Sequence, residues 1–111
     1  MKIERFYEHS DRYRFDFTLC TPSRGWAQVD TGQDAWYYGT WANPHELKIV
    51  CYCEGDVTIQ TAESEEEFAF AIFEIRDWNN KHGHGFTGID PMLKESIADQ
   101  FRALGLGDLL H

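Results

Sequence analysis

Residues 46–83 read ELKIVCYCEGDVTIQTAESEEEFAFAIFEIRDWNNKHG, and this stretch decides the fold. Apolar side chains alternate over residues 47–53 and again from Val57, and Gly55 between them suits a tight hairpin turn. The first of these strands is apolar on both faces, which is typical of a central strand. At Ser64 the apolar period changes from two to 3.6. The stretch therefore predicts a β-hairpin that is followed directly by a helix.

The predicted helix covers residues 65–82. Ser64 and Glu67 have the spacing of a capping box, in which the serine oxygen accepts from the Glu67 backbone and the Glu67 side chain reaches back. At about 100° per residue, one sector of the helix holds the expected core face. Its members are Phe68, Ala71, Ile72, Ile75 and Trp78.

The remaining segments extend the same pattern. Asp90 as N-cap and proline at the next position predict a second helix that ends at Gly105. Strands first and helices last predict one α+β domain over residues 1–111, with an antiparallel sheet of four or five strands and two helices packed on one face. The predicted strands lie within residues 2–61, at about 2–7, 12–20, 26–30, 46–53 and 57–61, with 12–30 as a hairpin, and 36–41 is a further strand candidate. The predicted helices cover 65–82 and 91–104.

Composition narrows the function classes. The chain has 111 residues, of which 42% are apolar and 15% aromatic, which is enough for a packed core and argues against disorder. No apolar run approaches the roughly 18 residues of a membrane span. The first eight residues lack the apolar centre of a signal peptide. Three cysteines in such a chain are typical of free thiols in the cytoplasm.

The charge is large and unevenly spread. The formal net charge is −9, and residues 54–77 carry eight acidic side chains and one basic side chain, whereas residues 1–29 have a net charge of +1. An acidic surface of this kind repels phosphate groups, which argues against direct binding of nucleic acid through this face. It attracts a protein partner that has a basic surface. Because the chain also lacks a long apolar run, we predict neither nucleic acid nor membrane as a direct partner.

Phe70 and Phe73 lie on the back of the predicted first helix, about 140–160° from the centre of its core face. In one interpretation the second helix covers both rings with Leu93, Ile97 and Phe101. In the other, the rings stay exposed inside a rim of carboxylates, which is the anatomy of a binding hot spot in a hetero-complex or a homodimer. Carboxylates in a first helical turn also complement the helix dipole without any partner. The candidate partner-binding residues are Glu63, Glu66, Glu67, Phe70, Phe73, Glu74 and Asp77.

Residues 30–44 place several large aromatic side chains in a segment without a regular period. Aromatic walls beside a carboxylate, with Asn43 nearby, suit a small ligand. The alternative is a second small core over the other face of the sheet. The two aspartates could form a pair of acid–base groups but are also common formers of Asx turns. The candidate cleft residues are Asp30, Asp34, Trp36, Tyr37, Tyr38 and Trp41.

The sequence gives little support for a metal site or for a catalytic nucleophile. Cys51, Cys53, His82 and His84 are residue types that bind zinc, but both cysteines share the apolar face of their strand and are expected in the core. No P-loop, dinucleotide-binding glycine pattern or hydrolase signature occurs in the chain. We therefore predict no metal, no cofactor and no catalytic residues.

Three segments, QDAWYYGTWANP at 33–44, GIDP at 88–91 and GLGDLLH at 105–111, resemble a group of small bacterial proteins associated with plasmids, phages and other mobile elements. The resemblance covers nearly the whole chain, and no activity comes with it that could be assigned to a residue. It implies a cytoplasmic setting and a role in conflict between a mobile element and its host.

These observations favour a non-catalytic acidic interaction module. The expected role is that of a mobile-element inhibitor or nucleic-acid mimic that acts on a basic host protein handling nucleic acid, as anti-defence proteins do. The alternative is a small-ligand-binding protein or small enzyme that uses residues 30–44. Salt-sensitive binding to a basic protein would favour the first hypothesis, whereas an aromatic cleft would bind its ligand with little dependence on salt.

Overall fold

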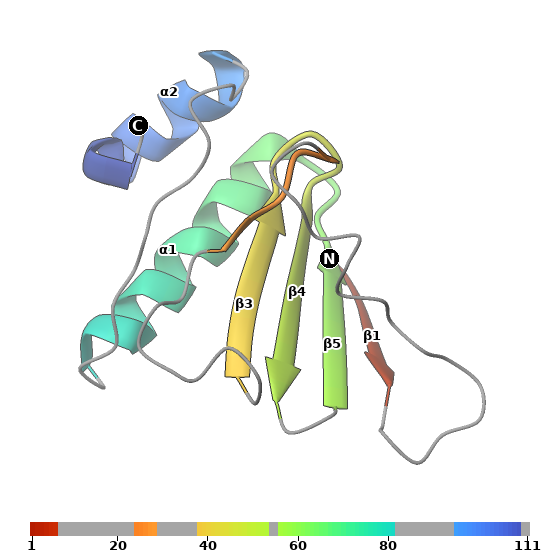
Figure 1. The fold of residues 1–111 in the computed structure, drawn as a ribbon. Coiled ribbons are helices and arrows are strands. Elements are labelled where there is room, and N and C mark those ends of the chain that lie inside the picture. The colour runs from red at the N-terminus through yellow and green to blue at the C-terminus, as the bar shows by residue number, and fades with distance from the viewer. Residues whose placement is uncertain (7–23, 29–37, 54–55, 82–94, 110–111) are drawn as a thin grey trace.

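An antiparallel sheet with strand order β1-β5-β4-β3-β2 forms the centre of this α+β fold (Figure 1). The computed structural model describes residues 1–6, 24–28, 38–53, 56–81 and 95–109. The strands within these ranges are β1 (Lys2–Phe6), β2 (Ala27–Gln28), β3 (Tyr38–Asn43), β4 (Lys48–Cys53) and β5 (Asp56–Thr61). Helices α1 (Glu65–Lys81) and α2 (Glu95–Ala103) and the short 3-10 helix η3 (Gly107–Leu109) follow.

Strand β4 is central, as its apolar pattern predicts. It pairs with β3 on one side and β5 on the other, so that Val50 lies opposite Trp41 and Ile59. Strand β1 pairs with β5, with Lys2 opposite Thr61. Strand β2 begins one residue later than the predicted 26–30 and pairs with β3, and residues 29 and 30 lie outside the described residues. The strand expected over 12–20 lies outside the described residues.

Both faces of the sheet bury apolar side chains. On one face, Ala42 and Ile49 belong to a core with both helices, and Cys51 packs against it; the helical members are Phe68, Ala69, Ala71, Ile72, Ile97 and Phe101. The opposite face holds a second cluster of Trp26, Val50, Val57 and Ile59, against which Phe6 and Trp41 pack. The alternation of β4 therefore places its two sets of side chains in two separate cores.

Helix α1 begins where the sequence predicts. The backbone N–H of Glu67 donates to Ser64 Oγ at 3.1 Å, which confirms Ser64 as the N-cap. The second half of the predicted capping box is wrong, because Glu67 Oε1 lies 2.8 Å from the Met1 ammonium nitrogen. A full positive charge attracts a carboxylate more strongly than a backbone N–H group does. Strand β1 and helix α1 are linked through this contact.

Helix α2 packs its apolar stripe against α1, and the Phe68 and Phe101 rings stack with centroids 6.3 Å apart. The helix ends at Ala103, and Gly105 follows it with a φ of 75°, which suits glycine. Gly105 N–H donates to Arg102 O, and Leu106 N–H donates to Phe101 O, which together form a Schellman motif. Leu106 is buried in the first core, so the chain directly after α2 packs on it at this residue.

The turn between β3 and β4 is organised by Asn43. Its side-chain oxygen accepts from the backbone of His45 and Glu46, and its Nδ2 donates to Arg24 O at 3.1 Å. Asn43 is buried, and these bonds occupy its amide. The sequence suggested Asn43 as a polar group near a ligand cleft, but the structure uses it to build a turn.

Candidate interaction face on helix α1

Phe70 and Phe73 form an exposed aromatic pair on α1. Their ring centroids lie 6.0 Å apart, and the side chains are 49% and 36% exposed. The interpretation in which α2 covers them is wrong, because Ile97 and Phe101 pack in the core with Phe68 instead. Leu93, the third expected cover, lies outside the described residues. Two large apolar rings therefore remain in contact with solvent on the outer side of the helix.

Carboxylates surround the aromatic pair, and two of them have no ion-pair partner among the described residues. Glu66 and Glu74 are exposed and make no ion pair with any residue that the structure describes. Asp77 differs, because its Oδ2 lies 2.9 Å from Lys81 Nζ in an i, i+4 pair. Acidic side chains in the first turn also favour the helix dipole, so part of this run has a structural role.

Glu63 and Glu67, the other two candidate carboxylates, lie beside the Met1 ammonium group. Its contact with Glu67, and then the nearby charge of Glu63, raise the pKa of the Met1 amino group, while desolvation opposes the shift. Glu67 is partly buried by this arrangement, whereas Glu63 stays exposed. Of the five predicted partner-binding carboxylates, Glu66 and Glu74 are thus the ones without a described countercharge.

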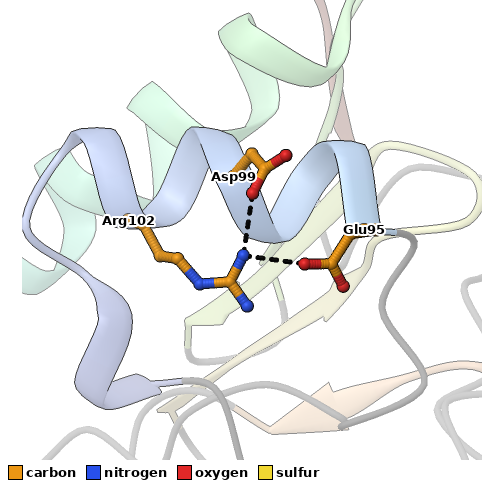
Figure 2. Close-up of polar contacts among 3 residues, drawn as sticks. All are labelled: Glu95, Asp99 and Arg102. Carbon is orange, nitrogen blue, oxygen red and sulfur yellow. Dashed lines mark hydrogen bonds and ion pairs between the residues drawn. The ribbon is translucent and has the colours of Figure 1, made fainter.

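Nearby arginines are held in place by other carboxylates. Arg76 is the single basic residue in 54–77, and its two terminal nitrogens donate to Asp108 Oδ1 and Oδ2 at 2.8 and 2.6 Å. This pairing raises the pKa of Arg76. Figure 2 shows the equivalent situation on α2, where Arg102 Nη1 donates to Glu95 Oε1 at 2.9 Å and Asp99 Oδ1 at 2.8 Å. Both carboxylates of α2 thereby share one cation, whereas Glu66 and Glu74 on α1 have none among the described residues.

A groove of about 470 Å³ lies beside the aromatic pair, between α1 and the sheet. Its side chains come from four strands and one helix, and they include Ile3, Thr40, Cys51, Gln60, Phe70, Glu74 and Trp78. We predicted Trp78 on the core face, and this is wrong, because its side chain is 53% exposed. Ile3 is 51% exposed although its register in β1 places it on the same sheet face as Ile49. Here α1 and the β1 edge of the sheet leave apolar surface uncovered.

Asn79 gives the groove a buried polar group that the sequence pattern did not reveal. Its side chain is only 2% exposed, and Nδ2 has no hydrogen-bond partner among the residues described. An unsatisfied buried amide donor costs about 1–3 kcal/mol. The signal was present in the helical period, because Asn79 follows the buried Ile72 by seven residues, or two turns. A search for apolar residues alone passes over such a position.

The described part of residues 30–44 contributes to internal packing. Trp41 packs against the second cluster, and its ring lies so close to Gly39 that a Cβ atom there would be 2.6 Å from Trp41 Cζ3. Tyr38 begins β3, but the structure does not describe its side chain. The other four cleft candidates, Asp30, Asp34, Trp36 and Tyr37, lie outside the described residues.

The suggested zinc ligands are not brought together in the part of the chain that the structure describes. Cys51 Sγ lies 3.7 Å from Thr40 Oγ1, within a hydroxyl–thiol hydrogen bond between neighbouring strands. The side chain of Cys53 and residues His82 and His84 are outside the description. Among the described side chains, no group of three or more His, Cys, Asp or Glu residues could hold a metal ion.

Comparisons with known proteins give no further assignment. No protein-family model matches the chain, and neither the curated proteins nor the solved structures gave a match. Within the described ranges, none of the helices is both long enough and apolar enough to cross a membrane. What the α1 face can do is therefore inferred from its chemistry. It offers apolar area, negative charge and a groove with a buried amide donor that has no partner among the described residues.

Proposed function

We propose that this protein is a non-catalytic interaction module that binds a basic protein surface through the outer face of α1. The observation that carries the proposal is the exposed Phe70–Phe73 pair with Glu66 and Glu74 beside it. Aromatic side chains are common anchors at protein interfaces, because they bury a large area at a low cost in conformational entropy.

The charge of the face favours a partner of opposite sign. Glu66 and Glu74 have no described countercharge, and the chain as a whole carries a net charge of −9. Long-range attraction would speed the encounter with a basic protein, and the rings would then slow dissociation. Two copies of this chain would bring like charges together, so the charge favours a hetero-complex over a homodimer through this face.

A protein that handles nucleic acid is the class of partner that we propose. Such proteins present basic surfaces to phosphate groups, and a row of carboxylates can occupy the same surface. In this role the protein would act in the cytoplasm as an inhibitor or nucleic-acid mimic, carried by a mobile element against a host defence. The resemblance of the sequence to proteins of mobile elements supports the proposed setting.

The test begins with capture of partners from a bacterial lysate at low and high salt, followed by purification of the captured protein. Calorimetry then compares the parent with the double variant Phe70→Ala, Phe73→Ala. We expect the parent to lose affinity as salt rises, because salt screens exposed charges. The double variant should bind at least about 30-fold more weakly, as hot-spot residues worth about 2 kcal/mol do.

Two controls separate binding from folding and from overall charge. Circular dichroism should show that the Phe70→Ala, Phe73→Ala variant melts close to the parent, because both side chains are exposed. Asp99→Asn removes one negative charge from α2 whose carboxylate is already paired with Arg102, and it should leave the affinity nearly unchanged. Unchanged affinity of the double phenylalanine variant for a partner that binds the parent would refute the proposal.

A further inference from the structure

We propose that the groove between α1 and the sheet is an anchor site for an arginine side chain of a peptide segment in the partner. This inference rests on the proposed function, because it specifies how a basic partner is recognised. The groove has a volume of about 470 Å³, within the range of roughly 300–1,000 Å³ that is usual for ligand sites. A single long side chain and the backbone next to it fit such a volume.

The sequence spacing on α1 places a carboxylate between two aromatic residues. Phe70, Glu74 and Trp78 lie four residues apart, so they are neighbours along one stripe of the helix, and all three line the groove. Phe70 and Trp78 are each about half exposed, at 49% and 53%. A cation that pairs with Glu74 would therefore lie close to two aromatic rings.

Guanidinium matches this stripe better than other cations. It is planar, stacks on aromatic faces and can donate two parallel hydrogen bonds to one carboxylate. The apolar stem of arginine would lie along Ile3, which is 51% exposed at the groove rim. Glu74 has no ion pair with a described residue, so its charge is available to the incoming group.

Asn79 favours a peptide over a simple cation. Its Nδ2 is a donor that lacks a described partner inside the protein, and Asn79 lines the groove while being 2% exposed. The group that satisfies it must be a hydrogen-bond acceptor. A polyamine or metal ion has no acceptor to offer, whereas a peptide that carries arginine brings a carbonyl oxygen with it.

The experiment uses N-acetyl-arginine N-methylamide as the probe and the full chain labelled with ¹⁵N. Titration should shift the Trp78 indole N–H and Asn79 carboxamide resonances in a saturable manner, with a dissociation constant of about a millimolar, as expected for a fragment. The citrulline analogue has the same shape without the charge. It should bind about threefold or more weakly, because it loses the ion pair and most of the cation–π attraction.

A matched pair of variants tests the position of the cation. Glu74→Gln should reduce arginine binding to the level of citrulline, whereas Glu65→Gln, which removes an equal charge from the same helix outside the groove lining, should not. Trp78→Ala should weaken binding without unfolding the protein, because Trp78 is half exposed. Equal binding of arginine and citrulline, or equal effects of the two glutamine variants, would overturn the arginine site.

The outcome also separates this inference from the proposed function. A partner whose binding depends on Phe70 and Phe73, together with no shift of Trp78 or Asn79 by the arginine probe, would refute the groove alone. Arginine-selective shifts that depend on Glu74, without any salt-sensitive protein partner, would support the groove and count against the proposed interaction module.

Discussion

Gly39→Ala is a severe test of how β3 packs. The change adds one methyl group, and the added Cβ would lie 2.6 Å from Trp41 Cζ3 and closer still to Cη2. Ordinary contacts between carbon atoms are about 3.5–4.0 Å, so the indole must move by about 1 Å or more. The indole packs against the cluster of Trp26, Val50, Val57 and Ile59, which restricts where it can go.

The magnitude follows from two opposed effects. Overpacking of this kind costs about 1–3 kcal/mol, and removal of glycine from a strand stabilises by about 0.5–1 kcal/mol. We expect Gly39→Ala to lower the free energy of unfolding by about 1–2 kcal/mol as the balance of these terms. Urea unfolding followed by circular dichroism gives the value.

A double-mutant cycle isolates the contact. In a Trp41→Ala background the obstructing ring is absent, so Gly39→Ala should be neutral or stabilising there. The difference between the two backgrounds is the coupling energy between positions 39 and 41. A Gly39→Ala effect that is the same in both backgrounds would show that the Trp41 ring does not lie over Gly39.

Three further predictions concern α1 and what it contacts. Ser64→Ala removes the N-cap bond and should destabilise by about 0.5–2 kcal/mol in thermal melting, and an unchanged melting temperature would contradict the cap. Phe68→Ala should lower the free energy of unfolding in urea by about 3–5 kcal/mol, because the Phe68 ring is fully buried. Trp78→Ala should change the same quantity by less than about 0.5 kcal/mol, because Trp78 is half exposed. Similar losses for the two variants would contradict the assigned core face. Asp108→Asn should destabilise by at most about 1 kcal/mol at low salt, and by less at high salt, because the Arg76–Asp108 pair is largely exposed; a salt-independent loss would argue against an ionic contribution.

Local patterns predicted the elements well where a residue's environment is set by its near neighbours. Ser64 begins α1 because a side-chain oxygen can accept from a backbone N–H three residues later, which depends on sequence spacing alone. Gly105 ends α2 for a similarly local reason, its positive φ. The two-sided apolar pattern of β4 placed the strand at the centre of the sheet.

The predictions were wrong where the burial or the contacts of a side chain depend on a part of the chain that is distant in sequence. Trp78 lies at the margin of the apolar sector of α1, and whether that margin is buried depends on how far the helix and the β1 edge of the sheet approach each other. The side chain of Glu67 forms an ion pair with the Met1 ammonium group. The pairing of β1 with β5 places Lys2 opposite Thr61, which brings the neighbouring Met1 close to the start of α1. Asn79 was overlooked because a hydrophobicity pattern registers only apolar residues on a buried face.

The sequence could predict which residues share the candidate face of α1, but it could not predict whether that face is exposed. Helical spacing put Phe70, Phe73 and Glu66 on one stripe, and this needs no tertiary information. Whether α2 would cover the rings could not be decided, because α2 has one apolar stripe and either part of α1 could have received it. The stacking of Phe101 on Phe68 settles that point and leaves the outer rings exposed.

The pairing of β1 with β5 has a consequence for the order of folding. Strands β3, β4 and β5 and helix α1 follow one another along the chain, so their contacts close short loops and can form early. Strand β1 joins Lys2 to Thr61, and this contact must wait for closure of a much longer loop. Amide exchange should therefore be faster in β1 than in β4, with β1 opening before the rest of the sheet. Because Ile3 lines the groove, the groove would be complete only after the β3–β5 sheet and α1 have formed, and it would be lost whenever β1 opens.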